Sequence, residues 1–200
     1  MKEVIIASAN KHKLEEIKSI LTDYKVISME EAGFVDDIVE DGKSFEENAL
    51  IKAKAINKKT GKLVLGDDSG LMVDYLNGEP GIYSARYAGE EKDDDKNNKK
   101  LLKALEGVKK EDRKAKFVCC VGICYEDGSV ETVRGEVEGE IGFKEVGDGG
   151  FGYDPLFYIE SLDKTYAELT FDEKNSVSHR RRAFTKAKEI LDKKLKWVEV

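Results

Sequence analysis

The chain has 200 residues, of which 40% are apolar and 38% charged, with a formal net charge of -7. A chain of this length is typical of one domain that buries about 70% of the surface its unfolded form exposes. Its acidity argues against binding to a nucleic-acid polymer or an anionic membrane, and no apolar run is long enough for a membrane span or a signal-peptide core. We therefore expect one domain over residues 1–200, with an uncertain tail at about 196–200, in a cytoplasmic protein.

The first third of the chain alternates strand and helix patterns. In chain order these are strand, helix, strand, helix and strand: Val4–Ala7, Lys11–Leu21, Lys25–Met29, Ser44 to about Asn57, and Leu63–Leu65. The apolar spacing of the first helix defines one buried face. Ser44 followed by Glu47 forms a capping box that favours a helix start, and Gly61 is a plausible stop.

Two adjacent carboxylates follow the strand at Leu63–Leu65. The sequence Gly66-Asp67-Asp68-Ser69-Gly70 predicts that this strand ends in a turn of small residues, before apolar spacing resumes at Leu71. Two like charges in a partly buried turn are unfavourable unless a cation, a proton or several donors compensate them. A solvated acidic turn is the alternative.

The remaining elements complete an α/β pattern. We expect a strand, a charged helix start or solvated surface, a long hairpin, a short strand and a last helix: Leu71–Tyr75, Glu90–Lys100, Ala115–Tyr125 with Val130–Ile141, Leu156–Ile159, and Ser178–Leu195. The class is α/β, with an elongated mixed sheet flanked by helices and two lobes around a cleft. Cys119 and Cys120 fall on opposite faces of the hairpin strand, so they cannot easily bridge each other and, with Cys124, are interpreted as buried reduced thiols.

Two N-terminal segments suit an anion and a cation. Ser8-Ala9-Asn10-Lys11-His12-Lys13 joins a strand to a helix, where backbone N–H groups, the helix dipole and Lys13 favour a phosphate. Capping alone is the alternative reading. The acidic loop Asp36–Gly42 is interpreted mainly as a solvated loop, but one of its carboxylates could meet Asp68 and complete an oxygen-ligand Mg²⁺ site. Lys52 could point at the same cleft or simply be exposed.

Two C-terminal segments suit a heteroaromatic base. In Gly147–Pro155, four glycines surround Phe151 and Tyr153, either of which could stack on a base while Asp154 accepts a ring N–H. A glycine turn with buried aromatics is equally plausible. In Glu173–Arg180, basic side chains precede the last helix, where they oppose its dipole unless a ligand compensates.

Several long motifs together resemble the inosine triphosphate pyrophosphatase family over residues 4 to about 191. The motifs that carry the resemblance occur in the family's order: Ser8-x-Asn10-x-x-Lys13, Ser44-Phe45-x-Glu47-Asn48-Ala49-x-x-Lys52-Ala53, Asp67-Asp68-Ser69-Gly70-Leu71, Leu76-Asn77-Gly78-x-Pro80-Gly81-Ile82-Tyr83-Ser84-Ala85-Arg86-Tyr87-Ala88-Gly89, Phe151-Gly152-Tyr153-Asp154-Pro155 and Ser178-His179-Arg180-x-x-Ala183.

The resemblance implies a homodimeric, Mg²⁺-dependent enzyme with a nucleotide cleft between two lobes. It would split ITP, dITP or XTP into the monophosphate and pyrophosphate. Asp68 and Glu40 would hold the metal, and Asp68 would also be the general base, a role that Asp67 might share. The remaining implied contacts are with substrate. Phosphate would meet Ser8 to Lys13, Lys52 and Lys174; Ser69 would lie against the nucleotide; and the base pocket would comprise Phe151, Gly152, Tyr153, Asp154, His179 and Arg180.

Selectivity would follow from hydrogen-bond polarity. Hypoxanthine and xanthine present an acceptor at position 6, where adenine presents a donor, so a buried donor such as Arg180 would leave groups unpaired against ATP. The alternatives are a metal-dependent triphosphatase of broader base preference and a non-catalytic nucleotide sensor.

Overall fold

The computed structural model describes residues 1–196, so the predicted tail lies outside the described residues except for Lys196. Its contacts divide the chain into two compact units. Unit 1 comprises Met1–Asp68, Cys119–Gly135 and the chain from His179 onward, and unit 2 comprises Ser69–Val118 and Glu136–Ser178. The cleft between two lobes, which the resemblance implies, stays a prediction, as does the single-domain assignment.

The strands of the described residues form one mixed sheet in the order β2-β1-β3-β4-β5-β6-β7. In chain order their bounds are Lys2–Ala7, Tyr24–Ser28, Val64–Val73, Lys114–Cys124, Val130–Ile141, Phe157–Ile159 and Lys164–Thr165. β1 pairs in parallel with β2 and β3, whereas β6 pairs antiparallel with β5 and β7. The predicted mixed α/β sheet is therefore confirmed.

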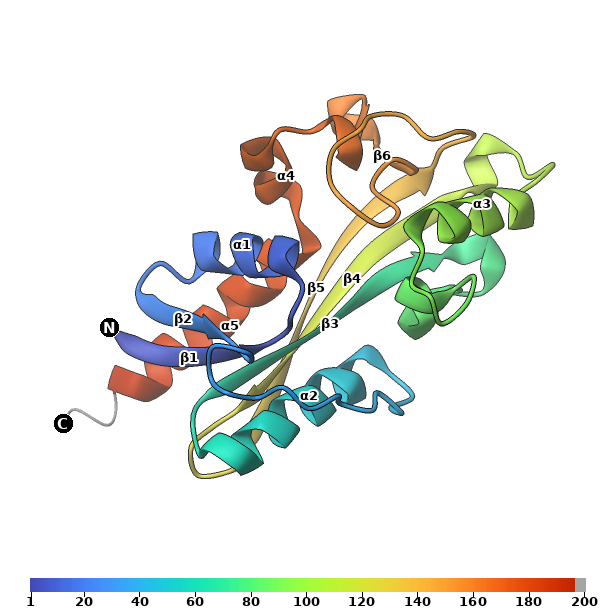
Figure 1. Ribbon diagram of the computed structural model, residues 1–200. Coiled ribbons are helices and arrows are strands. Elements are labelled where there is room, and N and C mark those ends of the chain that lie inside the picture. The colour runs from blue at the N-terminus through green and yellow to red at the C-terminus, as the bar shows by residue number, and fades with distance from the viewer. Residues whose placement is uncertain (197–200) are drawn as a thin grey trace. The chain divides into compact units, whose positions relative to one another are not determined.

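Helices cover both faces of the sheet in unit 1. α1 (Lys11–Ile20) and α5 (His179–Lys196) pack on one face, and α2 (Phe45–Thr60) packs on the other (Figure 1). Alternation along β1 supplies both cores, because Val4 and Ile6 join the α1/α5 side while Ile5 and Ala7 join the α2 side.

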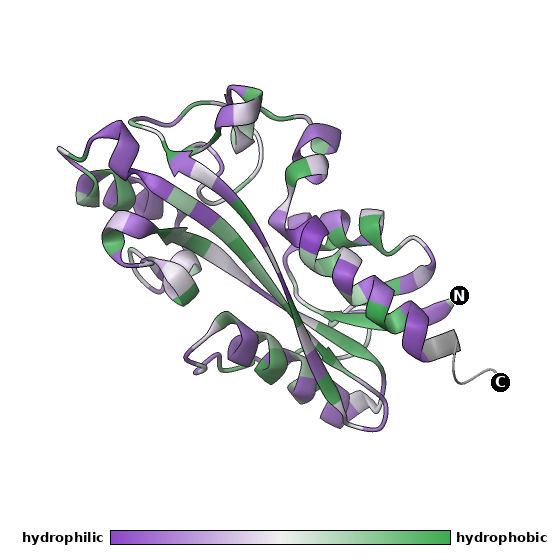
Figure 2. Ribbon diagram, turned by 180° about the vertical axis from the view of Figure 1, so that it is seen from behind, coloured by the Kyte–Doolittle hydropathy of each residue, from purple (hydrophilic) through white to green (hydrophobic). Residues whose placement is uncertain are grey.

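Unit 2 has its own apolar core. Helix α3 (Asp94–Ala104) contributes Leu101 to a cluster that includes Phe117, Phe157 and Tyr166. The rings of Phe117 and Tyr166 stack at 5.5 Å between centroids, and Phe157 packs edge-on against Tyr166 at 5.0 Å. In Figure 2 hydrophobic residues on the strands are interrupted by hydrophilic ones, and α5 of unit 1 also alternates hydrophilic and hydrophobic residues, as expected for a helix with one buried face.

One sequence prediction was wrong and one element was missed. β3 runs unbroken from Val64 to Val73, so Asp67 and Asp68 lie inside a strand and not in a turn between two strands. The sequence analysis also missed the short helix α4 (Phe171–Val177) before α5, which is capped by Thr170 and Glu173. No helix among the described residues is long and apolar enough to cross a membrane.

Candidate functional site

The adjacent carboxylates of β3 face opposite sides of the sheet. Successive strand residues point to opposite faces, so Asp67 projects toward α1 and α5 while Asp68 projects toward α2. Cys119 and Cys120 of β4 repeat this alternation. The Cys119 thiol lies 3.4 Å from Asp67 Oδ2 and the Cys120 thiol 3.1 Å from Glu46 Oε1 of α2, which confirms their predicted opposite faces and burial. Each carboxylate therefore has its own set of partners.

Asp67 is held by two cations. Lys13 Nζ donates to its Oδ1 at 2.5 Å and Arg180 Nε donates to its Oδ2 at 2.8 Å. Arg180 Nη1 also donates to Glu16 Oε2 at 2.6 Å, so α1 supplies both Lys13 and Glu16. Burial raises the pKa of Asp67, but the charges of Lys13 and Arg180 outweigh it and bring that pKa well below its usual range. Asp67 is thus a buried carboxylate whose negative charge is stabilised by two cations.

Asp68 has a different environment. Its Oδ1 accepts from Lys52 Nζ at 3.1 Å, and the same ammonium donates to Glu40 Oε2 at 2.9 Å. Asp68 Oδ2 is buried and has no hydrogen-bond partner among the described residues. Burial raises the pKa of Asp68 more than Lys52 and Lys13 lower it. A carboxylate with one oxygen available and a raised pKa suits proton transfer and metal binding.

Local hydrogen bonds place Glu40 and Lys52. Ser44 caps α2 by accepting from Glu47 N, while the Glu47 carboxylate accepts from Lys43 N at 2.7 Å. Asn48 Oδ1 accepts from Gly42 N at 2.9 Å, so the loop that carries Glu40 is fastened to the first turns of α2. The predicted cap of α2 by Ser44 is confirmed, whereas the Glu47 carboxylate accepts from Lys43 N and not from Ser44 N, as a capping box would require.

Two glycines bring α2 close to the sheet. A Cβ at Gly66 would lie 2.0 Å from Ala49 O, and one at Gly122 would lie 2.8 Å from Ala49 C. Gly66 precedes Asp68 by two residues on the same face of β3, and Ala49 lies one turn before Lys52 on α2. Backbone contact at this point therefore holds Lys52 within reach of Asp68.

The segment predicted to bind phosphate starts α1 as expected. Asn10 is the N-cap and accepts from Lys13 N at 3.2 Å, and Asn10 N donates to Ser8 Oγ at 3.2 Å. Residues 9 to 12, including Ala9, Lys11 and His12, are exposed. Helix-start N–H groups beside Lys13 are an arrangement that suits an anion.

The predicted base-binding loop lies in unit 2. Asp154 is buried, and its Oδ2 accepts from Lys174 Nζ at 2.6 Å and from Phe151 N at 3.0 Å. The Lys174 ammonium also lies 4.9 Å from the centroid of the Phe151 ring. Gly150 has a φ of +75°, and a Cβ there would lie 2.0 Å from Asp154 Oδ2, so this turn needs glycine.

The two aromatics of that loop have different surroundings. Tyr153 is buried in the core of unit 2 and donates its hydroxyl to Ser84 O at 2.8 Å, whereas Phe151 is partly exposed. Phe151 is therefore the more exposed of the two aromatics. Gly152 lies between them and donates its N–H to Asp94 Oδ2 at 2.7 Å. Ser69, also of unit 2, follows Asp68 in β3 and is partly buried.

The remaining two predicted base contacts start α5 in unit 1. His179 is buried, and a Cβ at Gly135 would lie 2.4 Å from its carbonyl oxygen, so the first turn of α5 rests on the backbone of β5. Arg180 is buried with its guanidinium on Asp67 and Glu16. The base-reading role of Arg180 stays a prediction.

Glu16 was missed by sequence reasoning. It lies on α1 one turn after Lys13, and only the fold brings it to Arg180, which is 164 residues away in sequence. The signal that could have found it is its place on the otherwise apolar face of α1, next to Ile17 and Ile20. A carboxylate at such a position requires a buried cation.

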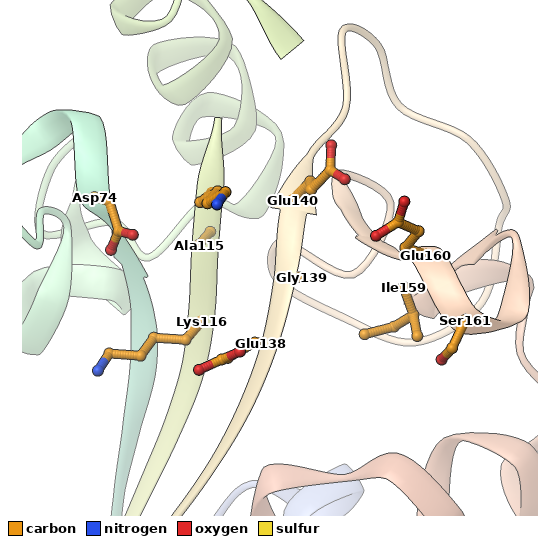
Figure 3. A pocket seen from close by; sticks show the side chains of 10 residues that line it. Asp74, Ala115, Lys116, Glu138, Gly139, Glu140, Ile159, Glu160 and Ser161 are labelled. Carbon is orange, nitrogen blue, oxygen red and sulfur yellow. The ribbon is translucent and has the colours of Figure 1, made fainter. Parts of the chain in front are cut away.

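Unit 2 also has an open pocket of about 570 Å³ (Figure 3). Its charged lining is mainly acidic: Asp74, Glu138, Glu140 and Glu160, with Lys114 and Lys116 as the cations. None of the predicted site residues lines it. Acidic side chains with their own lysine neighbours, such as Lys110 near Glu140 at 4.0 Å, indicate a solvated surface.

The fold and the carboxylate–lysine groups define an α/β protein with a buried acidic centre beside the start of helix α1. The comparisons with known proteins identify its family. Residues 4–190 match the model of the Ham1 family, and the chain belongs to that family.

The relatives have one name in common. The dITP/XTP pyrophosphatase of Bacillus licheniformis is 54% identical over 194 residues, covering 96% of this chain and 99% of the relative. That of Bacillus subtilis is 50% identical, covering 96% and 98%. Among solved structures, the Staphylococcus aureus Ham1 protein matches with a TM-score of 0.88 at 46% identity, over 96% of this chain and all of the other.

Proposed function

We propose that this protein hydrolyses the deaminated purine nucleoside triphosphates ITP, dITP and XTP to the monophosphate and pyrophosphate, removing them from the nucleotide pool. The observation that carries the proposal is the Asp68 carboxylate, buried and ionically linked to Lys52 and Glu40, with one oxygen that has no hydrogen-bond partner among the described residues. Relatives that are 50% identical or more and span the chain are named dITP/XTP pyrophosphatases, which supports this substrate class.

Mg²⁺ is the proposed cofactor, and the residues present fit it. Asp68 Oδ2 is a buried carboxylate oxygen with no described partner, and Glu40 supplies a second carboxylate that contacts the same Lys52 ammonium. No group of three or more His, Cys, Asp or Glu side chains in residues 1–196 is arranged to hold a metal. This agrees with Mg²⁺, which usually takes one or two carboxylates and completes its shell with water and substrate phosphates. Bound there, it would neutralise charge on the phosphates.

The chain's own groups have separate tasks in this proposal. The N–H groups at the start of α1 and the ammonium of Lys13 bind the phosphates, and Asp67 fixes Lys13. Lys52 adds a second cation, and Asp68 accepts the proton of the water that attacks the α-phosphorus. Asp67, saturated by Lys13 and Arg180, takes no part in proton transfer.

Base recognition is proposed for Phe151 with Asp154, and for His179 and Arg180. Phe151 would stack on the purine, and a donor toward the 6-oxo group would favour hypoxanthine and xanthine over adenine. Arg180→Ala tests the donor. If Arg180 reads the 6-oxo group, kcat/KM for ITP falls roughly 10- to 150-fold more than that for ATP, the value of a lost charged hydrogen bond. An equal fall in kcat/KM for ITP and ATP would mean that Arg180 only forms its ion pairs with Asp67 and Glu16.

A homodimer in the cytoplasm is also part of the proposal, and it rests on the resemblance. Light scattering of the purified protein at several concentrations would show a mass twice that of the chain. A mass equal to one chain at every concentration would exclude the dimer.

Product analysis tests the function directly. The protein is incubated with ITP, XTP, GTP and ATP plus Mg²⁺, and early products are separated by chromatography. We expect IMP and pyrophosphate in equal amounts from ITP. IDP and orthophosphate as first products would exclude the proposal, equal turnover of all substrates would indicate a broad triphosphatase, and binding without turnover would indicate a sensor.

A further inference from the structure

Lys52 lies between the two carboxylates that are proposed to hold the metal. Its ammonium is 2.9 Å from Glu40 Oε2 and 3.1 Å from Asp68 Oδ1, so one cation already bridges both groups. The side chain is buried, with a relative exposure of 8%. Burial lowers the pKa of Lys52, but Asp68 and Glu40 together outweigh that effect, so the ammonium keeps its charge in this position.

We propose that Lys52 is an internal substitute for the divalent cation. In the metal-free protein its ammonium neutralises Glu40 and Asp68, and a divalent cation that binds these carboxylates competes with it. The released ammonium then becomes available to a substrate phosphate. This inference rests on the proposed function, because it assigns a second role to a residue of the same site.

The geometry makes such an exchange possible without a change in the backbone. α2 is fixed at Ala49 by the close approach of Gly66 and Gly122, so the helix cannot follow the ammonium. The lysine has a flexible four-carbon stem and can move its charge alone. Because Asp68 Oδ2 has no described hydrogen-bond partner, the carboxylate can accept an incoming cation before the Lys52 contact is lost.

The charges of the three side chains determine whether metal and triphosphate help or oppose each other's binding. Glu40, Asp68 and Lys52 together carry one net negative charge, and a divalent cation added beside the ammonium would be repelled by it. A phosphate that accepts Lys52 removes this repulsion. Metal and triphosphate should therefore bind with positive cooperativity, and a neutral residue at position 52 should bind the metal well even without nucleotide.

The test is a Mn²⁺ titration of the full chain without nucleotide, in which electron paramagnetic resonance measures the concentration of the free ion. We expect Lys52→Met to bind Mn²⁺ at least about 10-fold more tightly than the unmodified protein, because a competing unit charge is removed from within a few ångströms. Lys54→Met is the matched control. Lys54 is exposed on the same helix, so its loss should leave the affinity unchanged.

A second variant tests the inference in case Lys52→Met does not fold. Lys52→Gln keeps a polar, uncharged side chain, and it should tighten Mn²⁺ binding in the same way. Thermal unfolding gives an independent readout, because added Mg²⁺ should raise the Tm of both neutral variants more than that of the unmodified protein. Equal or weaker Mn²⁺ affinity in folded Lys52→Met and Lys52→Gln would overturn the inference. It would leave the proposed function standing, since that is judged by IMP and pyrophosphate formation alone.

Discussion

Asp67 and Asp68 are neighbours in sequence but have different ion-pair partners, and substitution of each by Asn separates their proposed roles. Asp68→Asn removes the charge that is proposed to accept the proton and bind the metal, so we expect turnover of ITP to fall by at least about 10²-fold in a folded protein. Steady-state kinetics with far-UV circular dichroism would measure this. Near-normal turnover would move the proton acceptor elsewhere, with Glu40 as the next candidate.

Asp67→Asn should act on stability instead. It leaves the buried Arg180 and the partly buried Lys13 without their shared carboxylate, and breaking a buried ion pair costs about 3–5 kcal/mol. Urea unfolding monitored by fluorescence would measure the loss, with Asp68→Asn as the isosteric control one residue away. A similar loss of stability in the two variants would contradict the division of labour between them.

The sequence predicted the importance of this pair but not its place in the fold. Two acids among small residues indicate a turn when only neighbours are considered. The strand continues through them because Lys13 and Arg180, 54 and 113 residues away in sequence, neutralise Asp67 from one face, and Lys52 neutralises Asp68 from the other. Such compensation is not local, so no reading of the residues around β3 could supply it.

At the scale of elements, the backbone of helix α2 lies in close contact with strand β3 at Gly66. Gly66→Ala would put a methyl group 2.0 Å from a backbone oxygen of α2, and backbone cannot yield as a flexible side chain does. We expect a loss of about 3 kcal/mol or more in unfolding free energy, at or above the upper end of ordinary overpacking, together with lower kcat because Lys52 is displaced. Urea unfolding and kinetics would measure both.

Gly142→Ala is the matched control for this substitution. Its added Cβ would meet its nearest atoms at 3.4 and 3.6 Å, which is ordinary van der Waals contact. It should therefore change stability by less than about 1 kcal/mol and leave turnover intact. Equal effects of the two substitutions would show that the close approach of α2 is not what positions Lys52.

Elements with strong local signals were predictable and those without were not. The capping box at Ser44 and Glu47 predicted the start of α2, and the apolar alternation predicted β4 and β5. α4 was missed although Thr170 and Glu173 form the same capping pattern, because its seven residues are too few to show a helical period. β7 has two residues and owes its pairing to β6 rather than to any pattern of its own.

For the whole molecule, the balance of charge determines how a triphosphate can bind. The chain carries a formal net charge of -7, and the site of unit 1 does not reverse it locally. There, three cations (Lys13, Lys52 and Arg180) face four carboxylates (Glu16, Glu40, Asp67 and Asp68) in the ion pairs. A net negative centre attracts a divalent cation and repels a nucleotide that is itself an anion.

We therefore expect nucleotide binding to depend on the metal, and we expect Asp68→Asn to weaken that dependence. In excess EDTA, ITP should bind the unmodified protein at least about 10-fold more weakly than with Mg²⁺. Asp68→Asn removes one negative charge from the centre, so its affinity for ITP in EDTA should exceed that of the unmodified protein. Calorimetry in EDTA measures the affinity of both proteins for ITP without turnover. Asp68→Asn, which is expected to turn over slowly, can also be titrated with ITP in the presence of Mg²⁺. If Asp68→Asn bound ITP no better than the unmodified protein in EDTA, charge repulsion at this carboxylate would not be what makes the metal necessary.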